Sequence, residues 1–309
     1  MLYFFKLIRF KNLIMIALVQ YLIKYALLLP FTQTHGVVTT LSHFNFFLLV
    51  LATICIAACG YIINDIQDIE SDSINKPHKV IINKHINENI ATALFVILNI
   101  IGVGLGYYIA SRIGKSNLFP IFFVASALLY MYSTFLKHIV LVGNIIVALV
   151  VSLSILLVGI FELLPVMTVD NRSIQILFFS IIRDYAIFAF IINLIREMVK
   201  DIEDIDGDYK AGTKSLPVIA GRARATKITF VLSLIPLFTV TYYVITYLFK
   251  QLAVVGYFLI VVIAPLIYIS IKLFSATQKS DYKHISLILK LVMLTGMLSI
   301  LLYNFILLK

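Results

Sequence analysis

Tryptophan is absent from this chain of 309 residues, cysteine occurs only twice, and 13% of the residues are charged. Cys55 and Cys59 lie four residues apart in an apolar run, and neither they nor the six histidines show the spacing of a zinc site. The scarcity of charge, together with 61% hydrophobic residues and a mean hydropathy of +1.03, excludes a soluble globular protein. The alternating pattern of amphipathic strands is also missing. The composition therefore predicts an all-α membrane protein.

Long hydrophobic runs are what the sequence has in abundance. A helix needs about 20 mostly apolar residues to cross a bilayer with its backbone groups paired internally. Nine segments meet this requirement, at residues 13–31, 43–63, 90–110, 118–136, 139–161, 174–196, 227–248, 252–274 and 286–308. We therefore expect a multi-pass bundle of about nine transmembrane helices around a central cavity, built as a single domain over residues 1–309.

Basic residues are distributed unevenly between the two sides of these segments. If the N-terminus is cytoplasmic, the opposite side holds only Arg112, Lys115, Arg172, Lys250 and Lys309. Because basic residues in short loops resist translocation, this asymmetry predicts an integral protein of the cytoplasmic membrane with its basic loops facing the cytoplasm. The net charge of +10 follows from this rule and from anionic lipid head groups, so nucleic acid is not an expected partner. Glu162 and Asp184 fall near the outer side, where interfacial positions are expected.

Acidic residues are few, and most of them lie in two short windows. Ten of the 15 acidic residues fall within 64–79 and 196–214. Each window contains three aspartates at i, i+3 and i+7, and the second set follows the first at a constant offset of 136 residues: Asp65, Asp68, Asp72, Asp201, Asp204 and Asp208. On a helix that continues out of the membrane, this spacing places the three carboxylates on one face. The offset predicts two related halves, each carrying one window.

Like charges at this spacing repel one another, so a cation is their natural partner. Mg²⁺ fits, because it prefers carboxylate oxygens, retains water and is often shared with a substrate phosphate. Basic residues also stand beside the aspartates, among them Lys76, Lys79, Arg196, Lys200 and Lys214. A site for a metal alone would not need these cations, whereas a diphosphate that bridges metal ions and basic side chains would. The two windows therefore predict a site for magnesium and a diphosphate.

Several motifs carry a resemblance to a known family. The first window reads N-D-x-x-D-x-x-x-D from Asn64 and continues as N-K-P-H-K from Asn75, and residues 196–221 read REMVKDIEDIDGDYKAGTKSLPVIAG. Both resemble the aspartate motifs of the UbiA superfamily of intramembrane prenyltransferases, and the second is most similar to the branch that makes digeranylgeranylglyceryl phosphate. The R-F-K-N run ending at Asn12 is similar to the family's R-P-x-N motif. Lys137 stands where the family has a basic residue after its fourth helix, and Phe161-Glu162 departs from the small glycines of related chains.

The resemblance implies an enzyme that transfers a prenyl group, geranylgeranyl in that branch, from its diphosphate to a lipophilic acceptor, the hydroxyl of a prenylglyceryl phosphate. Two Mg²⁺ ions are expected, held by Asn64, Asp65, Asp68, Asp72, Asp201, Asp204 and Asp208. The substrates are expected to contact Asn12, Asn64, Lys76, Lys79, Lys137, Arg196, Lys200 and Lys214. The 23 Phe and 17 Tyr offer aromatic faces for a prenyl tunnel that opens to the membrane lipids.

Alternative functions remain open at this point. The acceptor could be an aromatic quinone precursor, such as a hydroxybenzoate or dihydroxynaphthoate, in place of a prenylglyceryl phosphate. The group that accepts the acceptor's proton could be a carboxylate of either window or the released diphosphate. In a different class, a divalent-cation transporter could use paired acidic motifs, although it predicts carboxylates deep within several helices. The clustering of the carboxylates beside basic loops favours the enzyme.

Overall fold

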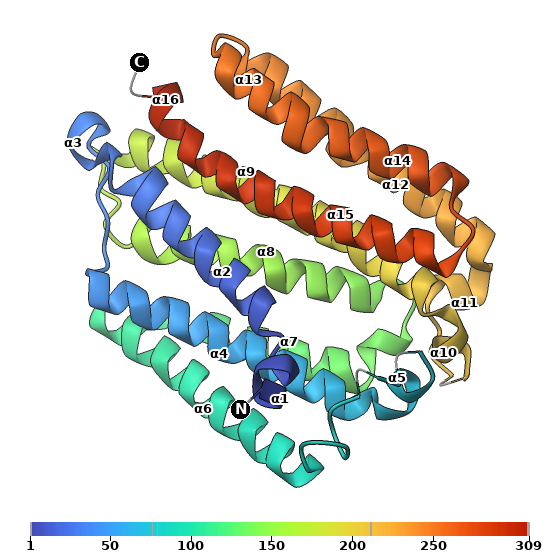
Figure 1. Ribbon diagram of the computed structural model, residues 1–309. Coiled ribbons are helices and arrows are strands. Elements are labelled where there is room, and N and C mark those ends of the chain that lie inside the picture. Colours follow the sequence, from blue (N-terminus) through green and yellow to red (C-terminus); the bar gives the residue numbers. More distant parts are fainter. Residues whose placement is uncertain (1, 76, 79, 211, 308–309) are drawn as a thin grey trace.

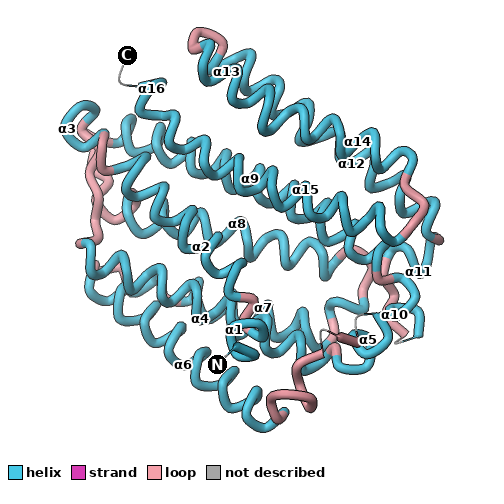
Figure 2. The backbone as a smooth tube through the Cα atoms, in the orientation of Figure 1, coloured by secondary structure: helices cyan, strands magenta, loops and turns pink. Residues whose placement is uncertain are grey.

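The computed structural model describes residues 2–75, 77–78, 80–210 and 212–307 (Figure 1). In these ranges the chain forms helices and no strand, and nine helical spans are long and apolar enough to cross a membrane. Loops connect the spans at their ends (Figure 2). The expected all-α fold and the expected number of spans are both confirmed.

Five of the spans are single α-helices and the others are built from successive helical pieces. The single helices are α4 (His43–Gln67), α6 (Glu88–Arg112), α8 (Val142–Glu162) and α9 (Arg172–Glu203), together with α7 (Pro120–Thr134), which a 3₁₀ turn at Ser116–Leu118 precedes. The composite spans are α2 (Phe10–Leu22) with π-helical Ile23–Leu28, α12 (Arg222–Tyr243) with π-helical Val244–Leu248, α13 (Leu252–Phe258) with π-helical Leu259–Ile263 and α14 (Ala264–Ser275), and α15 (Lys279–Leu298) with 3₁₀ Ser299–Leu302 and α16 (Tyr303–Leu307). Short connecting helices are α1 (Leu2–Leu7), α3 (Phe31–His35), α5 (Ile69–Asn75), α10 (Ile205–Lys210) and α11 (Leu216–Ala220).

Local side chains mark where several helices begin. The hydroxyl of Ser42 accepts a hydrogen bond from the amide of Asn45 at the start of α4, and the side chain of Asn87 accepts one from Asn89 at the start of α6. Gln278 and Asp281 form a reciprocal capping box at the start of α15. These contacts satisfy amide groups that have no partner within the helix, so they define the boundaries between membrane span and loop.

Six of the spans form a closed ring. In order around the ring, α4 contacts α7, α7 contacts α8, α8 contacts α9, α9 contacts α15, α15 contacts α2, and α2 returns to α4. The remaining spans pack outside it, α6 against α4 and the α12 to α14 region against α9 and α15 (Figure 1). The expectation placed all nine helices around a central cavity. In the described residues six spans form the ring around it, and the other three pack outside the ring.

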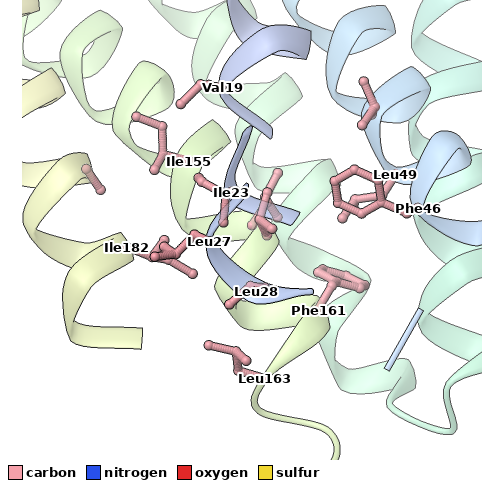
Figure 3. Close-up of a cluster of buried hydrophobic side chains, with 14 of the residues drawn as sticks. Val19, Ile23, Leu27, Leu28, Phe46, Leu49, Ile155, Phe161, Leu163 and Ile182 are labelled. Atoms are coloured by element: carbon pink, nitrogen blue, oxygen red, sulfur yellow. The ribbon is translucent and has the colours of Figure 1, made fainter. Parts of the chain in front are cut away.

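Apolar side chains are arranged for two different surroundings. At one end of the ring a dense cluster from the π-helical piece after α2 and from α4, α8 and α9 includes Ile23, Phe46, Phe161 and Ile182, each fully buried (Figure 3). On the outside, large apolar residues such as Phe238 of α12 are about two-thirds exposed in the isolated chain. Exposed apolar side chains over a whole helical surface indicate contact with lipid.

An ion pair lies inside the bundle next to the apolar cluster. Lys24 Nζ lies 2.6 Å from Glu162 Oε1, and the two side chains are 1% and 0% exposed. Lys24 also donates to the carbonyl of Leu41, whose amide donates to Glu162 Oε2 at 3.0 Å. Glu162 is the last residue of α8, and its side chain is buried inside the protein. Its charge is tolerated in the interior because an opposite charge and a backbone amide compensate its lost hydration.

The helices that carry the aspartate windows are interrupted. α4 ends at Gln67 and α5 begins at Ile69, so the break falls on Asp68, whose φ and ψ are −100° and 10°. α9 ends at Glu203 and α10 begins at Ile205, with Asp204 at −99° and 9°. The prediction of a continuous helix through each set of three aspartates is therefore wrong. The short helices α5 and α10 contact each other, which brings the two windows to the same end of the bundle (Figure 1).

Candidate active site

The ring of six helices encloses a cavity of about 1070 Å³. Five of the six motif aspartates line it at the end where α5 and α10 meet: Asp68, Asp72, Asp201, Asp204 and Asp208. Farther along α4, α8 and α15 the walls are apolar and include Ile56, Val151 and Met297. The cavity stops at the apolar cluster, to which its lining residues Val19 and Ile155 belong. It therefore joins a charged mouth to a closed apolar interior.

In the first window Asp68 contacts two side chains. Its Oδ1 lies 2.5 Å from the Nζ of Lys137, and its Oδ2 accepts a hydrogen bond from Asn64 Nδ2 at 2.6 Å. Lys137 comes from the turn between α7 and α8, so this contact links two parts of the ring that are 69 residues apart. The structure therefore brings Asn64, Asp68 and Lys137 together at the cavity wall.

Asp65 is placed differently from the other aspartates. It does not belong to the cavity lining, and its Oδ1 accepts a hydrogen bond from Arg9 Nη2 at 2.9 Å. The Arg9 guanidinium also lies 4.9 Å from the centre of the Tyr61 ring. Burial alone would lower the pKa of Arg9, but the Asp65 carboxylate and Tyr61 outweigh it and raise that pKa above its ordinary value. Arg9 thus stays cationic and holds Asp65 away from its two companions.

The second window lies on the facing wall. Asp201 is held by an amide, since Asn144 Nδ2 of α8 donates to its Oδ2 at 2.7 Å. Asp204 and Asp208 follow at the break and on α10, and the amide of Asp208 donates to the carbonyl of Asp204 at 3.1 Å. Asparagine thus approaches an aspartate in both windows, Asn64 beside Asp68 and Asn144 beside Asp201.

The basic residues that the sequence singled out separate into three groups. Lys137, Arg196 and Lys200 line the cavity, and so does Asn12. Lys214 instead lines a separate small hollow with His138 and Gly212, and burial followed by the charge of Lys137 lowers the pKa of that histidine. Lys76 and Lys79 lie outside the described residues.

Some of the residues at this site were not anticipated as functional. Glu197 accepts hydrogen bonds from Lys200 Nζ at 2.8 Å and from Arg196 Nη1 at 3.2 Å, so it neutralises part of the basic charge. Arg9 was visible only as part of the R-F-K-N run that resembles a family motif. Lys290 of α15 lines the cavity although it stands alone in an apolar stretch. Its isolation within a membrane segment is the signal that could have identified it.

The donor set is compatible with magnesium held jointly with a substrate. No three His, Cys, Asp or Glu side chains come together as a metal site within the described ranges. Mg²⁺ does not require such a cage, because it is commonly bound by one or two carboxylates together with substrate phosphate and water. The Oδ1 of Asn64 is buried and has no hydrogen-bond partner among the described residues. A buried oxygen acceptor beside the Asp68 carboxylate fits the needs of a hard cation.

The fold and the site define a multi-pass membrane protein with a mouth lined by aspartates and basic residues above an apolar chamber. The model of the UbiA prenyltransferase family matches residues 26–294, and the chain belongs to this family. Family membership favours an enzyme over the divalent-cation transporter considered from the sequence.

Individual relatives and structures agree with this assignment. The chain is 38% identical over 178 residues to the digeranylgeranylglyceryl phosphate synthase of Sulfolobus acidocaldarius, an alignment that covers 57% of this chain and 58% of the relative's length. It is 30% identical over 256 residues to the enzyme of that name from Methanosphaera stadtmanae, covering 81% and 86%. A UbiA homologue from Archaeoglobus fulgidus, solved with GPP and Mg²⁺, is similar with a TM-score of 0.60 at 17% identity, covering 96% of this chain and 99% of that one. At that identity the last similarity shows the fold.

Proposed function

We propose that this protein is a magnesium-dependent prenyltransferase that moves a geranylgeranyl group from its diphosphate to the hydroxyl of a prenylglyceryl phosphate. The observation that carries the proposal is the shape of one cavity, which has Asp68, Asp204 and Lys137 at its mouth and apolar walls in its interior. A prenyl diphosphate has the same division, with a highly charged head and a long apolar tail. The names of the relatives from Sulfolobus acidocaldarius and Methanosphaera stadtmanae support the choice of product.

The mouth would hold the donor's head group. Asn64, Asp68, Asp72 and the three aspartates of the second window are the residues that would hold two magnesium ions. When bound, these ions supply positive charge that stabilises the leaving diphosphate. Lys137 is positioned to add a charge-assisted hydrogen bond to a diphosphate oxygen, because its ammonium already lies at the cavity wall beside Asp68.

Positive charge beside the diphosphate matters most during bond cleavage. Ionisation of an allylic diphosphate places increasing negative charge on the leaving group, and fixed cations lower the barrier by stabilising that charge. Lys200 of α9 is one turn from Asp204 and shares Glu197 with Arg196, which holds its ammonium in a defined place. These contacts orient the basic side chains before the substrate arrives, so little reorganisation is needed at the moment of reaction.

The interior would hold the prenyl chain and keep water away from the allylic cation. Water entering the chamber would convert the cation to an alcohol, so a dry wall is part of the function. Ile56, Val151 and Phe122 contribute to that wall from three different helices. Phe122 also stacks edge-to-face on Phe161, with ring centres 5.5 Å apart, which closes the chamber at its far end.

The distribution of basic loops suggests which side of the membrane the mouth faces. The basic residues near the two windows belong to the side that retains most of the lysines and arginines, and we therefore assign the mouth to the cytoplasmic side. Soluble diphosphate could leave from that side, while both lipid substrates would enter from the bilayer.

A transfer assay with the purified full-length protein tests the proposal. Labelled geranylgeranyl diphosphate is supplied with geranylgeranylglyceryl phosphate, hydroxybenzoate or dihydroxynaphthoate in separate reactions, each with Mg²⁺ or with excess EDTA. We expect a labelled diether product only from the glyceryl phosphate and only with Mg²⁺. If label is transferred only to an aromatic acid, the proposed acceptor is wrong. Equal transfer with Mg²⁺ and with EDTA would refute the dependence on metal.

A further inference from the structure

A second polar group lines the same cavity beside the start of the second aspartate window. Asn193 and Arg196 stand three residues apart on one face of α9, Lys290 projects from α15, and Asn12 comes from α2. α15 contacts both α9 and α2, so these four side chains belong to one corner of the ring. Asn193 is eight residues before Asp201, which separates them by about 12 Å along the helix. The group therefore extends from Arg196, next to the mouth, to Asn193 farther along the cavity.

Two donor atoms in this corner have no acceptor among the described residues. Asn193 is 4% exposed, and its Nδ2 has no hydrogen-bond partner among the described residues. The buried Nε of Arg196 has none within the same ranges. Leaving a buried donor unpaired costs about 1–3 kcal/mol, so such groups at a cavity wall indicate a ligand that accepts hydrogen bonds.

The corner also has an excess of positive charge. Lys290 Nζ donates to the neutral Oδ1 of Asn12 at 2.7 Å, and no ion pair is found for it in the described part of the chain. Arg196 and Lys200 share the single carboxylate of Glu197. Lys290 also lies close enough to Arg196 for the two positive charges to repel. Lys290 and Arg196 thus bring two cations to this corner, and the anionic oxygens of a phosphate monoester would accept hydrogen bonds from both.

We propose that Asn193, Arg196, Lys290 and Asn12 form a subsite for the phosphate monoester head group of the acceptor. The inference rests on the proposed function, and it assigns Arg196 and Asn12 to the acceptor although the sequence suggested contact with the diphosphate. A cavity with one anion site at the mouth and another along α9 holds the two lipid head groups apart, while the prenyl carbon and the acceptor hydroxyl meet between them.

Kinetic separation of the two substrates is the first test. Lys290→Met should raise the KM for geranylgeranylglyceryl phosphate about ten- to a hundredfold, the range expected for losing one charge-assisted hydrogen bond, and leave the KM for geranylgeranyl diphosphate unchanged. Lys290→Arg keeps the charge and should retain most acceptor affinity. Lys283→Met, an exposed position on the same helix, is the matched control and should behave as wild type. A rise in the donor KM, or no change in either KM, would overturn the assignment.

A binding measurement makes the subsite testable without turnover. In EDTA, dodecyl phosphate should raise the unfolding temperature of the wild-type protein in neutral detergent by a few degrees more than dodecanol does. Lys290→Met and Asn193→Leu should each lose this difference, while Lys283→Met keeps it. The absence of any difference in wild type, or its persistence in both variants, contradicts the subsite. A wild-type protein that binds dodecyl phosphate in this way but transfers no prenyl group would refute the proposed function alone.

Discussion

Asp68 and Asp204, which are 136 residues apart in the sequence, occupy the same backbone position in two different helices. Each is the residue at which a long membrane helix breaks before a short helix follows, and their φ and ψ angles agree within about a degree. Each also lies in the wall of the central cavity. Because the long helix breaks at this residue, the next aspartate of each window lies on a separate short helix. These residues are Asp72 on α5 and Asp208 on α10, and both line the cavity.

The position of these two residues leads to a prediction about turnover. Asp68→Asn or Asp204→Asn removes a negative charge at the mouth without removing apolar packing, so activity should fall about a hundredfold or more while the protein stays folded. The loss of activity is measured from initial rates at saturating Mg²⁺. The unfolding temperature of each variant shows whether the protein stays folded. Asp206→Asn is the matched control, because Asp206 belongs to the same window but its side chain is 72% exposed and outside the cavity lining. Near-normal rates in both cavity variants would mean that these carboxylates do not hold the metal.

Lys137 should act on the donor. Its ammonium sits against Asp68 at the mouth, where it can turn to a diphosphate oxygen. Lys137→Ala should lower kcat/KM for the prenyl diphosphate roughly ten- to more than a hundredfold and leave acceptor affinity nearly constant, because a charge-assisted contact contributes about 1.5–3 kcal/mol. Lys210→Ala, at an exposed site in the second window, provides the comparison. An effect confined to the KM of the acceptor would show that Lys137 binds the other substrate. Lys79, given the same role from the sequence, lies outside the described residues.

The buried pair of Lys24 and Glu162 should matter for stability. Lys24→Met leaves the Glu162 carboxylate without its counter-ion in the interior, and the free energy of unfolding should drop by about 3–5 kcal/mol. Adding Glu162→Gln removes the stranded charge while keeping an acceptor for the Leu41 amide, so the double variant should recover much of the loss. Arg183→Met breaks a pair with Asp184 whose side chains are 55% and 37% exposed, so it should cost less than Lys24→Met. Thermal unfolding in one detergent compares all three, and equal losses for Lys24→Met and Arg183→Met would contradict the argument.

A substitution at Gly106 tests where the prenyl tail lies in the cavity. A Cβ atom at this position would stand 2.4 Å from Cγ of Phe122, whose ring is backed by Phe161 and lines the cavity. Gly106→Ala should push the ring toward the chamber, so turnover with geranylgeranyl diphosphate should fall more than turnover with the shorter geranyl diphosphate. At Gly104, two residues away, an added Cβ meets nothing within 4 Å, and Gly104→Ala should leave the ratio of the two rates unchanged. An unaltered ratio in Gly106→Ala would mean that the tail does not reach Phe122.

Much of the site could be anticipated because its parts are local in the sequence. The aspartates of each window are separated by three and four residues, and any helical path brings such neighbours together. That logic fails at Asp65, which points to Arg9 instead of the cavity, because an arginine from a distant segment competes for it. Sequence spacing also fails for Lys214, because the course of the chain after α10 places its side chain in a separate small hollow. Spacing alone does not say which partner a carboxylate will meet.

The sequence by itself determined the membrane environment, the number of spans, the helical fold and the family. Each of these depends on composition, on the length of apolar runs or on short motifs, and needs no knowledge of what touches what. Only the tertiary structure decided that six spans enclose the cavity, that Asn144 holds Asp201, and that Lys290 meets Asn12 across 278 residues. The physical reason is that nearly all segments are apolar on every side, so hydropathy cannot distinguish a face toward lipid from a face toward protein. Packing of the whole ring makes that distinction.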